Sequence, residues 1–191
     1  QLDLTLALIE RIGAYIKQDA AMLFVNCGDH KNVFDAVNKK IESLGIKCES
    51  HLEWNDARAF ATKALSADVS DAHVFYNRDI FAAVYTTNLL MRTCDVLITK
   101  PSELAFYPVP KLLIRRVGGH EAWGAVRSSE VGDGTLECES DEHIVQALDL
   151  LVTEDDLITM YCENIVKQKK IGTYDGAYNV VKLAMNWRKN A

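Results

Sequence analysis

The sequence lacks the features of membrane, repeat and low-complexity proteins. Its 191 residues include only 3 prolines, and we find no internal repeat, low-complexity tract or linker. No apolar run approaches the roughly 20 residues that span a bilayer, and no signal peptide is visible. We therefore expect one folded domain over residues 1–191, cytoplasmic and without a transmembrane segment.

The sequence also lacks the cysteine spacing of metal sites and an excess of positive charge. The 5 cysteines form no C-x-x-C pair, so we expect reduced thiols that pack as small apolar side chains. The net charge is −6, which argues against a general nucleic-acid surface because such binding needs excess lysine and arginine. A local basic patch is still possible, because four basic residues lie close together in the sequence: Lys100, Lys111, Arg115 and Arg116.

Apolar segments of strand length alternate with segments of helical period. We expect strands near 21–27, 46–52, 72–76, 94–99 and 111–115, and helices near 3–17, 33–44, 56–67, 79–92 and from 140 onward. Strands that alternate with helices are typical of parallel sheets. The prediction is an α/β fold with a doubly wound parallel sheet, closed by a C-terminal helical block.

The loop after the first expected strand is a candidate phosphate site. It reads Gly28, Asp29, His30 and Lys31 and leads into a helix. Backbone N–H groups at a helix start, helped by the lysine, suit an anion, although an ordinary tight turn explains the same residues. The loop is not a G-x-G-x-x-G fingerprint, which argues against a dinucleotide cofactor.

The loop after the fourth expected strand reads Lys100, Pro101, Ser102 and Glu103. The proline ends the strand because it cannot donate to a ladder. Ser102 could cap a short helix with Glu103 in its first turn. Alternatively, the carboxylate accepts hydrogen bonds from a ribose or sugar diol.

The loop after the fifth expected strand reads Gly118, Gly119, His120 and Glu121. Two glycines allow a ligand to approach the backbone, and the histidine and glutamate offer a donor and an acceptor. A flexible turn with solvated side chains is the alternative. Polar loops at the carboxyl ends of neighbouring strands are where open α/β sheets bind ligands.

Three other histidines carry no recognisable metal motif. We interpret His51, His73 and His143 as structural and expect no metal site. No G-x-S-x-G frame surrounds Ser128, so a hydrolase triad is not indicated.

Four short elements follow one another in a familiar order. They are D-V-L-I-T-K-P at 95–101, V-P at 109–110, G-H-E at 119–121 and G-D-G at 132–134. Together they resemble the C-terminal, donor-binding half of GT-B glycosyltransferases, specifically the group with diacylglycerol glycosyltransferases and the peptidoglycan N-acetylglucosaminyltransferase. The resemblance spans about residues 20–150.

The resemblance implies a nucleotide-diphosphate-sugar donor, with a UDP-sugar as the first expectation. The diphosphate would lie near residues 28–31 and Gly119, the ribose at Glu103, and the sugar at His120 and Glu121. Transfer in this group needs neither metal nor cofactor. The acceptor would bind an N-terminal half, so this chain, which begins with Gln1, is expected to be part of a longer protein.

The chain also departs from the family pattern. Ser102 and Glu103 stand where the family has two glycines, and His120 replaces a glutamine. Glu103 either stands in for the family's ribose-binding glutamate or fills a glycine position. Two other functions therefore stay open: a nucleotide-sugar epimerase, and a non-catalytic module for regulation or assembly.

Overall fold

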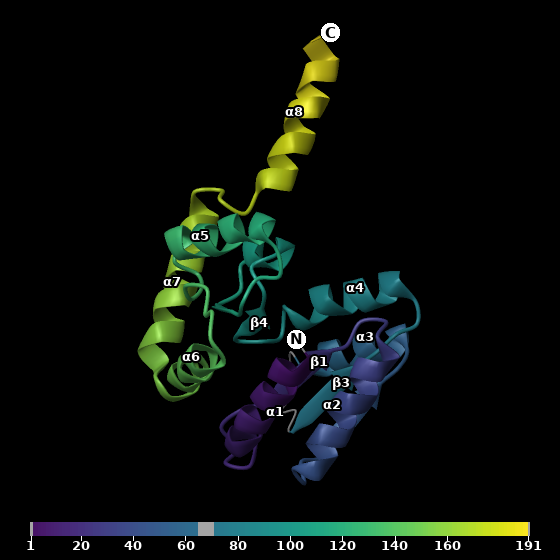
Figure 1. The fold of residues 1–191 in the computed structure, drawn as a ribbon. Helices are drawn as coiled ribbons and strands as arrows, with labels where there is room; N and C mark the ends of the chain where they lie inside the picture. The colour runs from purple at the N-terminus through teal and green to yellow at the C-terminus, as the bar shows by residue number, and fades with distance from the viewer. Residues whose placement is uncertain (1, 65–70, 191) are drawn as a thin grey trace. The chain divides into compact units, whose positions relative to one another are not determined.

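The computed structural model describes residues 2–64 and 71–190. The chain divides into two compact units, Gln1–Cys94 and Asp95–Ala191 (Figure 1). The sequence predicted one domain with one sheet, but the described strands form two separate parallel sheets. The division follows from strand pairing, because the fourth strand pairs with the fifth and not with the first sheet.

The first unit contains a three-stranded parallel sheet with the order β1-β3-β2. Its strands are β1 (Leu23–Asn26), β2 (Cys48–His51) and β3 (Ala72–Phe75). The central strand, β3, is buried at every residue. It pairs in register with β1 on one side and β2 on the other. β1 and β2 therefore depend on the last strand of the unit for their pairing.

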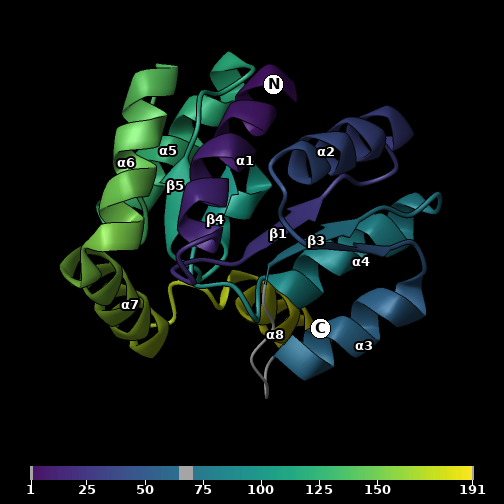
Figure 2. The ribbon, with the colours of Figure 1, turned by 90° about the horizontal axis from the view of Figure 1, so that it is seen from below.

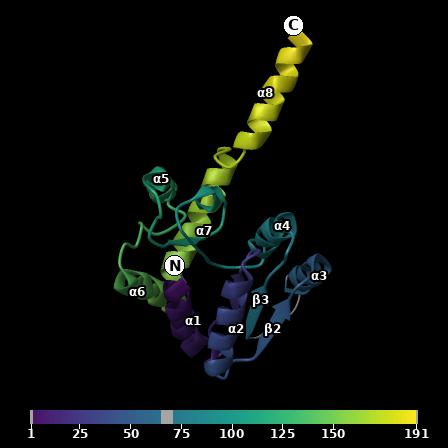
Figure 3. The same cartoon turned by 45° about the vertical axis from the view of Figure 1, so that its right-hand side comes forward.

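Four helices cover this sheet, namely α1 (Leu2–Ile16), α2 (Lys31–Ser43), α3 (Trp54–Ala64) and α4 (Ile80–Leu90). Successive residues of a strand face opposite sides of the sheet. The contacts of these residues therefore show which helices lie on each side. Ser50 donates a hydrogen bond to Asn38 of α2, whereas Phe75 packs against Phe60 of α3. α1 contacts α2, and α4 contacts α3, so the sheet lies between two helical layers (Figures 2 and 3).

The second unit is built on a two-stranded parallel sheet of β4 (Leu97–Thr99) and β5 (Lys111–Leu113). Parallel bridges from Lys111 to Gly134 and from Ile114 to Cys138 extend it by one more segment. Short 3-10 helices follow each strand, η1 (Glu103–Phe106) and η2 (Gly119–Glu121). Four longer helices complete the unit: α5 (Ala122–Val131), α6 (Asp141–Thr153), α7 (Asp155–Lys170) and α8 (Gly176–Asn190).

The core of the second unit lies between β5 and its helices. Leu112, Leu113 and Ile144 are fully buried, whereas the side chains of residues 176–187 in α8 are all exposed. None of the described helices is both long enough and apolar enough to cross a membrane.

The α/β class and the parallel pairing of the strands are confirmed. One helix was not expected: α5 follows directly on the Gly118–Glu121 loop. Gly124 lies near the start of α5, and glycine is a poor helix former. The sequence pattern therefore does not predict this helix. Here the glycine is needed, since a Cβ at this position would lie 2.2 Å from the carbonyl oxygen of Pro101.

Candidate functional site

The loop after β1 borders a pocket of about 360 Å³ within the first unit. Gly28 turns the chain at this point with φ +61°. It lines the pocket together with His30, and most of the remaining wall comes from α1 and α4, which contribute both apolar side chains and the threonines Thr5 and Thr87. Asn26 also lines the pocket, but its amide already donates to Ala83 and Thr87 of α4. The pocket therefore offers few polar groups to a ligand.

The other two residues predicted for this loop do not line the pocket. The Lys31 ammonium pairs with Asp35 one turn along α2, and Asp29 Oδ1 lies 3.7 Å from His30 Nδ1. The lysine that was expected to face a phosphate is thus paired with its own helix. The structure supplies the turn but not the cradle with a free cation.

The second unit brings Lys100 and Glu121 together. Lys100 follows β4, and Glu121 ends η2 after β5. Their Nζ and Oε1 atoms lie 3.0 Å apart, with the lysine side chain 39% exposed and the glutamate 4% exposed. Adjacent parallel strands end at the same edge of a sheet, so this contact between two loops follows from the pairing of β4 with β5.

Glu121 also organises the loop that leads into it. Its Oε2 accepts hydrogen bonds from the N–H groups of Val117 at 2.7 Å and Gly118 at 3.3 Å. The Val117 hydrogen bond and the Lys100 ammonium lower the pKa of the Glu121 carboxyl to about 2, against an ordinary value of 4.5. The carboxylate is therefore charged at neutral pH and holds the loop around itself.

Gly119 and His120 lie on the outside of this loop, where both are exposed. A Cβ on Gly119 would meet nothing within 4 Å, whereas one on Gly118 would touch the His120 ring. The backbone at Gly119 is consequently open to approach by a ligand.

The loop after β4 is only partly described. Ser102 is half-buried and precedes η1, but its side chain makes no capping hydrogen bond. Glu103 begins η1, and its side chain lies outside the described part of the structure. The capping role expected for Ser102 is therefore not found, and the ribose role of Glu103 stays a prediction.

The local basic group considered from the sequence is not a cationic surface. Lys111 is fully buried and paired with Asp133, Lys100 pairs with Glu121, and Arg116 pairs with Glu137. Lys111 was missed as an interior residue because a lysine at the start of a strand is normally exposed.

The described chain is a mixed α/β protein with two small parallel sheets. In the second unit, polar loops follow the carboxyl ends of the neighbouring strands β4 and β5. The chain belongs to a family described as "Domain of unknown function (DUF6938)", whose model matches residues 1–185. No curated protein matches the chain. The family description names no reaction and no ligand.

Proposed function

We propose that this chain binds the nucleotide-diphosphate part of a sugar donor, as the donor-binding part of a GT-B-type glycosyltransferase. The observation that carries the proposal is the Lys100–Glu121 ion pair. It joins the T-K-P element to the G-H-E element, the two parts of the sequence with the most specific resemblance to that family. Both lie at the carboxyl ends of neighbouring parallel strands, where α/β proteins bind ligands.

In this proposal Lys100 and the backbone of Gly119 bind the diphosphate. The lysine is part-exposed, and a backbone without a Cβ allows close approach. Positive charge and N–H groups placed at the departing diphosphate stabilise the charge that develops as the sugar leaves. This is the role that a metal plays in other transferases, so the proposed reaction needs none.

Glu121 is a positioning residue in this proposal. A carboxylate has about four lone-pair sites, and three are used by Val117, Gly118 and Lys100. Its side chain is only 4% exposed. Glu121 therefore fixes the lysine and the loop, and the exposed His120 is left as the side chain nearest in sequence to contact the sugar.

The proposal rests on the second unit. The loop at 28–31 belongs to the first unit, and its lysine does not line the pocket beside that loop. An acceptor-binding N-terminal half, a UDP-sugar as donor and a cytoplasmic location are further parts of the proposal taken from the resemblance.

The test is an NMR titration of the chain with UDP, UDP-sugars and GDP-sugars, repeated with EDTA present. We expect the amide signals of residues 117–121 to shift, and the Lys100→Met variant to bind about tenfold more weakly, as for loss of one charge-assisted hydrogen bond. Lys31→Met is the matched control and should bind as the parent does. Gly119→Ala should keep the fold and weaken binding.

Two results would contradict the proposal. One is the absence of shifts at 117–121 with any of these nucleotides at millimolar concentration. The other is loss of binding in Lys31→Met with Lys100→Met unaffected, which would move the site to the first unit. Conversion of the donor sugar without an acceptor would identify an epimerase instead.

A further inference from the structure

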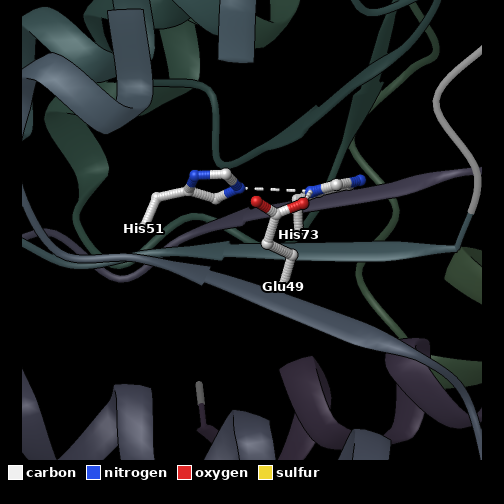
Figure 4. A group of neighbouring side chains, drawn as sticks. All are labelled: Glu49, His51 and His73. Atoms are coloured by element: carbon white, nitrogen blue, oxygen red, sulfur yellow. Dashed lines mark hydrogen bonds and ion pairs between the residues drawn. The ribbon is translucent and has the colours of Figure 1, made fainter. Parts of the chain in front are cut away.

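Three potential metal ligands share one face of the first sheet. Glu49 and His51 are two residues apart on β2, so their side chains lie on the same face. His73 is paired directly with Glu49 across the β2–β3 ladder, which places it beside them (Figure 4). The sequence alone predicts both histidines to be structural, because neither belongs to a recognisable metal motif.

The ligand atoms have the spacing of a small coordination sphere. His51 Nε2 lies 3.2 Å from His73 Nδ1, and His73 Nδ1 lies 3.7 Å from Glu49 Oε2. One ligand atom from each residue falls within 4.8 Å of the others. Tetrahedral zinc with bonds near 2.0–2.1 Å places its ligand atoms about 3.3 Å apart. The two histidine nitrogens already have this spacing, and the glutamate oxygen lies slightly farther away. A bound ion would replace the hydrogen bond between the two rings.

The two histidines are held in place by aromatic neighbours. Their exposed fractions are 5% for His51 and 4% for His73. His51 stacks on Phe75 with ring centroids 4.5 Å apart, and the Phe60 ring lies 4.2 Å from His73. Such packing fixes ring orientation and surrounds a site with apolar groups, which strengthens binding by preorganised ligands.

Glu49 opens this arrangement to solvent. Its side chain is 67% exposed and comes from β2, which pairs on one side only in the described sheet. The carboxylate can therefore adjust its position, and an ion can enter from its side. A hydrogen bond between two neutral histidines is enough to explain the 3.2 Å contact between the rings. That hydrogen bond does not explain why the Glu49 carboxylate lies beside them.

We infer that Glu49, His51 and His73 bind a divalent transition-metal ion, with Zn²⁺ as the first choice. Two imidazoles and one carboxylate favour zinc, cobalt or nickel over magnesium and calcium, which prefer oxygen ligands. Three protein ligands leave a fourth position for water. The ion would connect the edge strand β2 to the central strand β3, independently of any donor bound to the second unit.

The test uses the full chain after removal of metal with EDTA and dialysis. Zn²⁺ is added while the imidazole nitrogens are followed by ¹H–¹⁵N NMR, and Co²⁺ is added separately while visible absorption is recorded. We expect one equivalent to bind, with shifts at His51 Nε2 and His73 Nδ1. Bound Co²⁺ should give a tetrahedral spectrum without a thiolate charge-transfer band, which excludes the cysteines as ligands.

Glu49→Gln is the diagnostic variant because an exposed side chain can be changed without loss of fold. We expect it to weaken Zn²⁺ binding at least tenfold with an unchanged circular dichroism spectrum. Glu53→Gln, an exposed glutamate just beyond β2, is the matched control and should bind as the parent does. His143→Gln controls for binding to surface histidines.

Three outcomes would overturn the inference. They are no change in the two imidazoles at millimolar Zn²⁺, equal affinity in Glu49→Gln and the parent, and loss of binding only in His143→Gln. The first would leave the two rings joined by a hydrogen bond alone. None of these outcomes depends on whether the second unit binds a nucleotide.

Discussion

Lys111 and Asp133 form an ion pair inside the second unit, with Nζ 2.9 Å from Oδ2 and side chains 0% and 2% exposed. The lysine also donates to the carbonyls of Tyr107 and Val109. The carboxylate accepts from Ser128 through Oδ1 and from the Tyr174 hydroxyl through Oδ2. Every charged atom thus has partners, and the pair connects β5 to segments on both sides of it in the sequence.

Removal of Asp133 should destabilise the second unit strongly. Asp133→Ala leaves Lys111 buried without its counter-ion, where burial already lowers the pKa of the lysine. Breaking one side of a buried pair costs about 3–5 kcal/mol. We expect a loss of this size in urea unfolding followed by NMR signals of β5, with signals of β3 reporting the first unit separately.

The control for this measurement is Glu163→Ala on α7. Glu163 pairs with Lys167 at 3.7 Å, and both side chains are about two-thirds exposed. Exposed pairs contribute about 0–1 kcal/mol. A loss in Asp133→Ala no larger than that in Glu163→Ala would show that the buried pair does not hold the unit together.

The Glu121 carboxylate should make the second unit acid-sensitive. Its pKa is about 2 in the folded protein, against 4.5 for the ordinary group, so the unfolded chain binds more protons in that range. The free energy of unfolding should therefore fall as the pH drops from about 4.5 toward 2. Unfolding by urea at several pH values in this range measures the effect.

Glu121→Gln removes the titrating group. The slope of the free energy of unfolding against pH should then decrease by an amount that corresponds to up to about one bound proton. Glu130→Gln, an exposed glutamate at the end of α5, should leave it unchanged. An identical pH dependence in Glu121→Gln and the parent would mean that Glu121 does not titrate as the contacts require.

The cysteines should differ in reactivity toward alkylating reagents. Cys162 is exposed and Cys27 is buried, and burial raises the pKa of the Cys27 thiol to about 12. Because the thiolate is the nucleophile, iodoacetamide at pH 8 should label Cys162 first and Cys27 last. Peptide mass spectrometry over time measures the order, and urea should make all five react.

Much of the secondary structure could be predicted because it depends on local pattern. The spacing of Leu4, Leu8 and Ile12 predicts α1, and all three are buried. Strand order is not local. Nothing in the sequence indicates that β3 lies between β1 and β2, and the pairing of β3 with β2 is what places His73 beside Glu49.

The candidate sites show the same limit. Lys100 and Glu121 could be expected near one another because both follow strands that pair in parallel. Lys111 could not be assigned to the interior, since its partner Asp133 is distant in sequence and the pairing appears only in the folded chain. The loop at 28–31 carries the expected residues, but the contact of Lys31 with Asp35 depends on where α2 begins.

The central position of β3 also sets when the first sheet can assemble during synthesis. β1 and β2 pair with β3 and not with each other, so neither ladder exists in a nascent chain that ends before Ala72. β1 and β2 therefore cannot form their ladders until residues 72–75 leave the ribosome. By then the residues of α1 to α3 have already been synthesised. Both ladders of this sheet can therefore form only after β3 has been made.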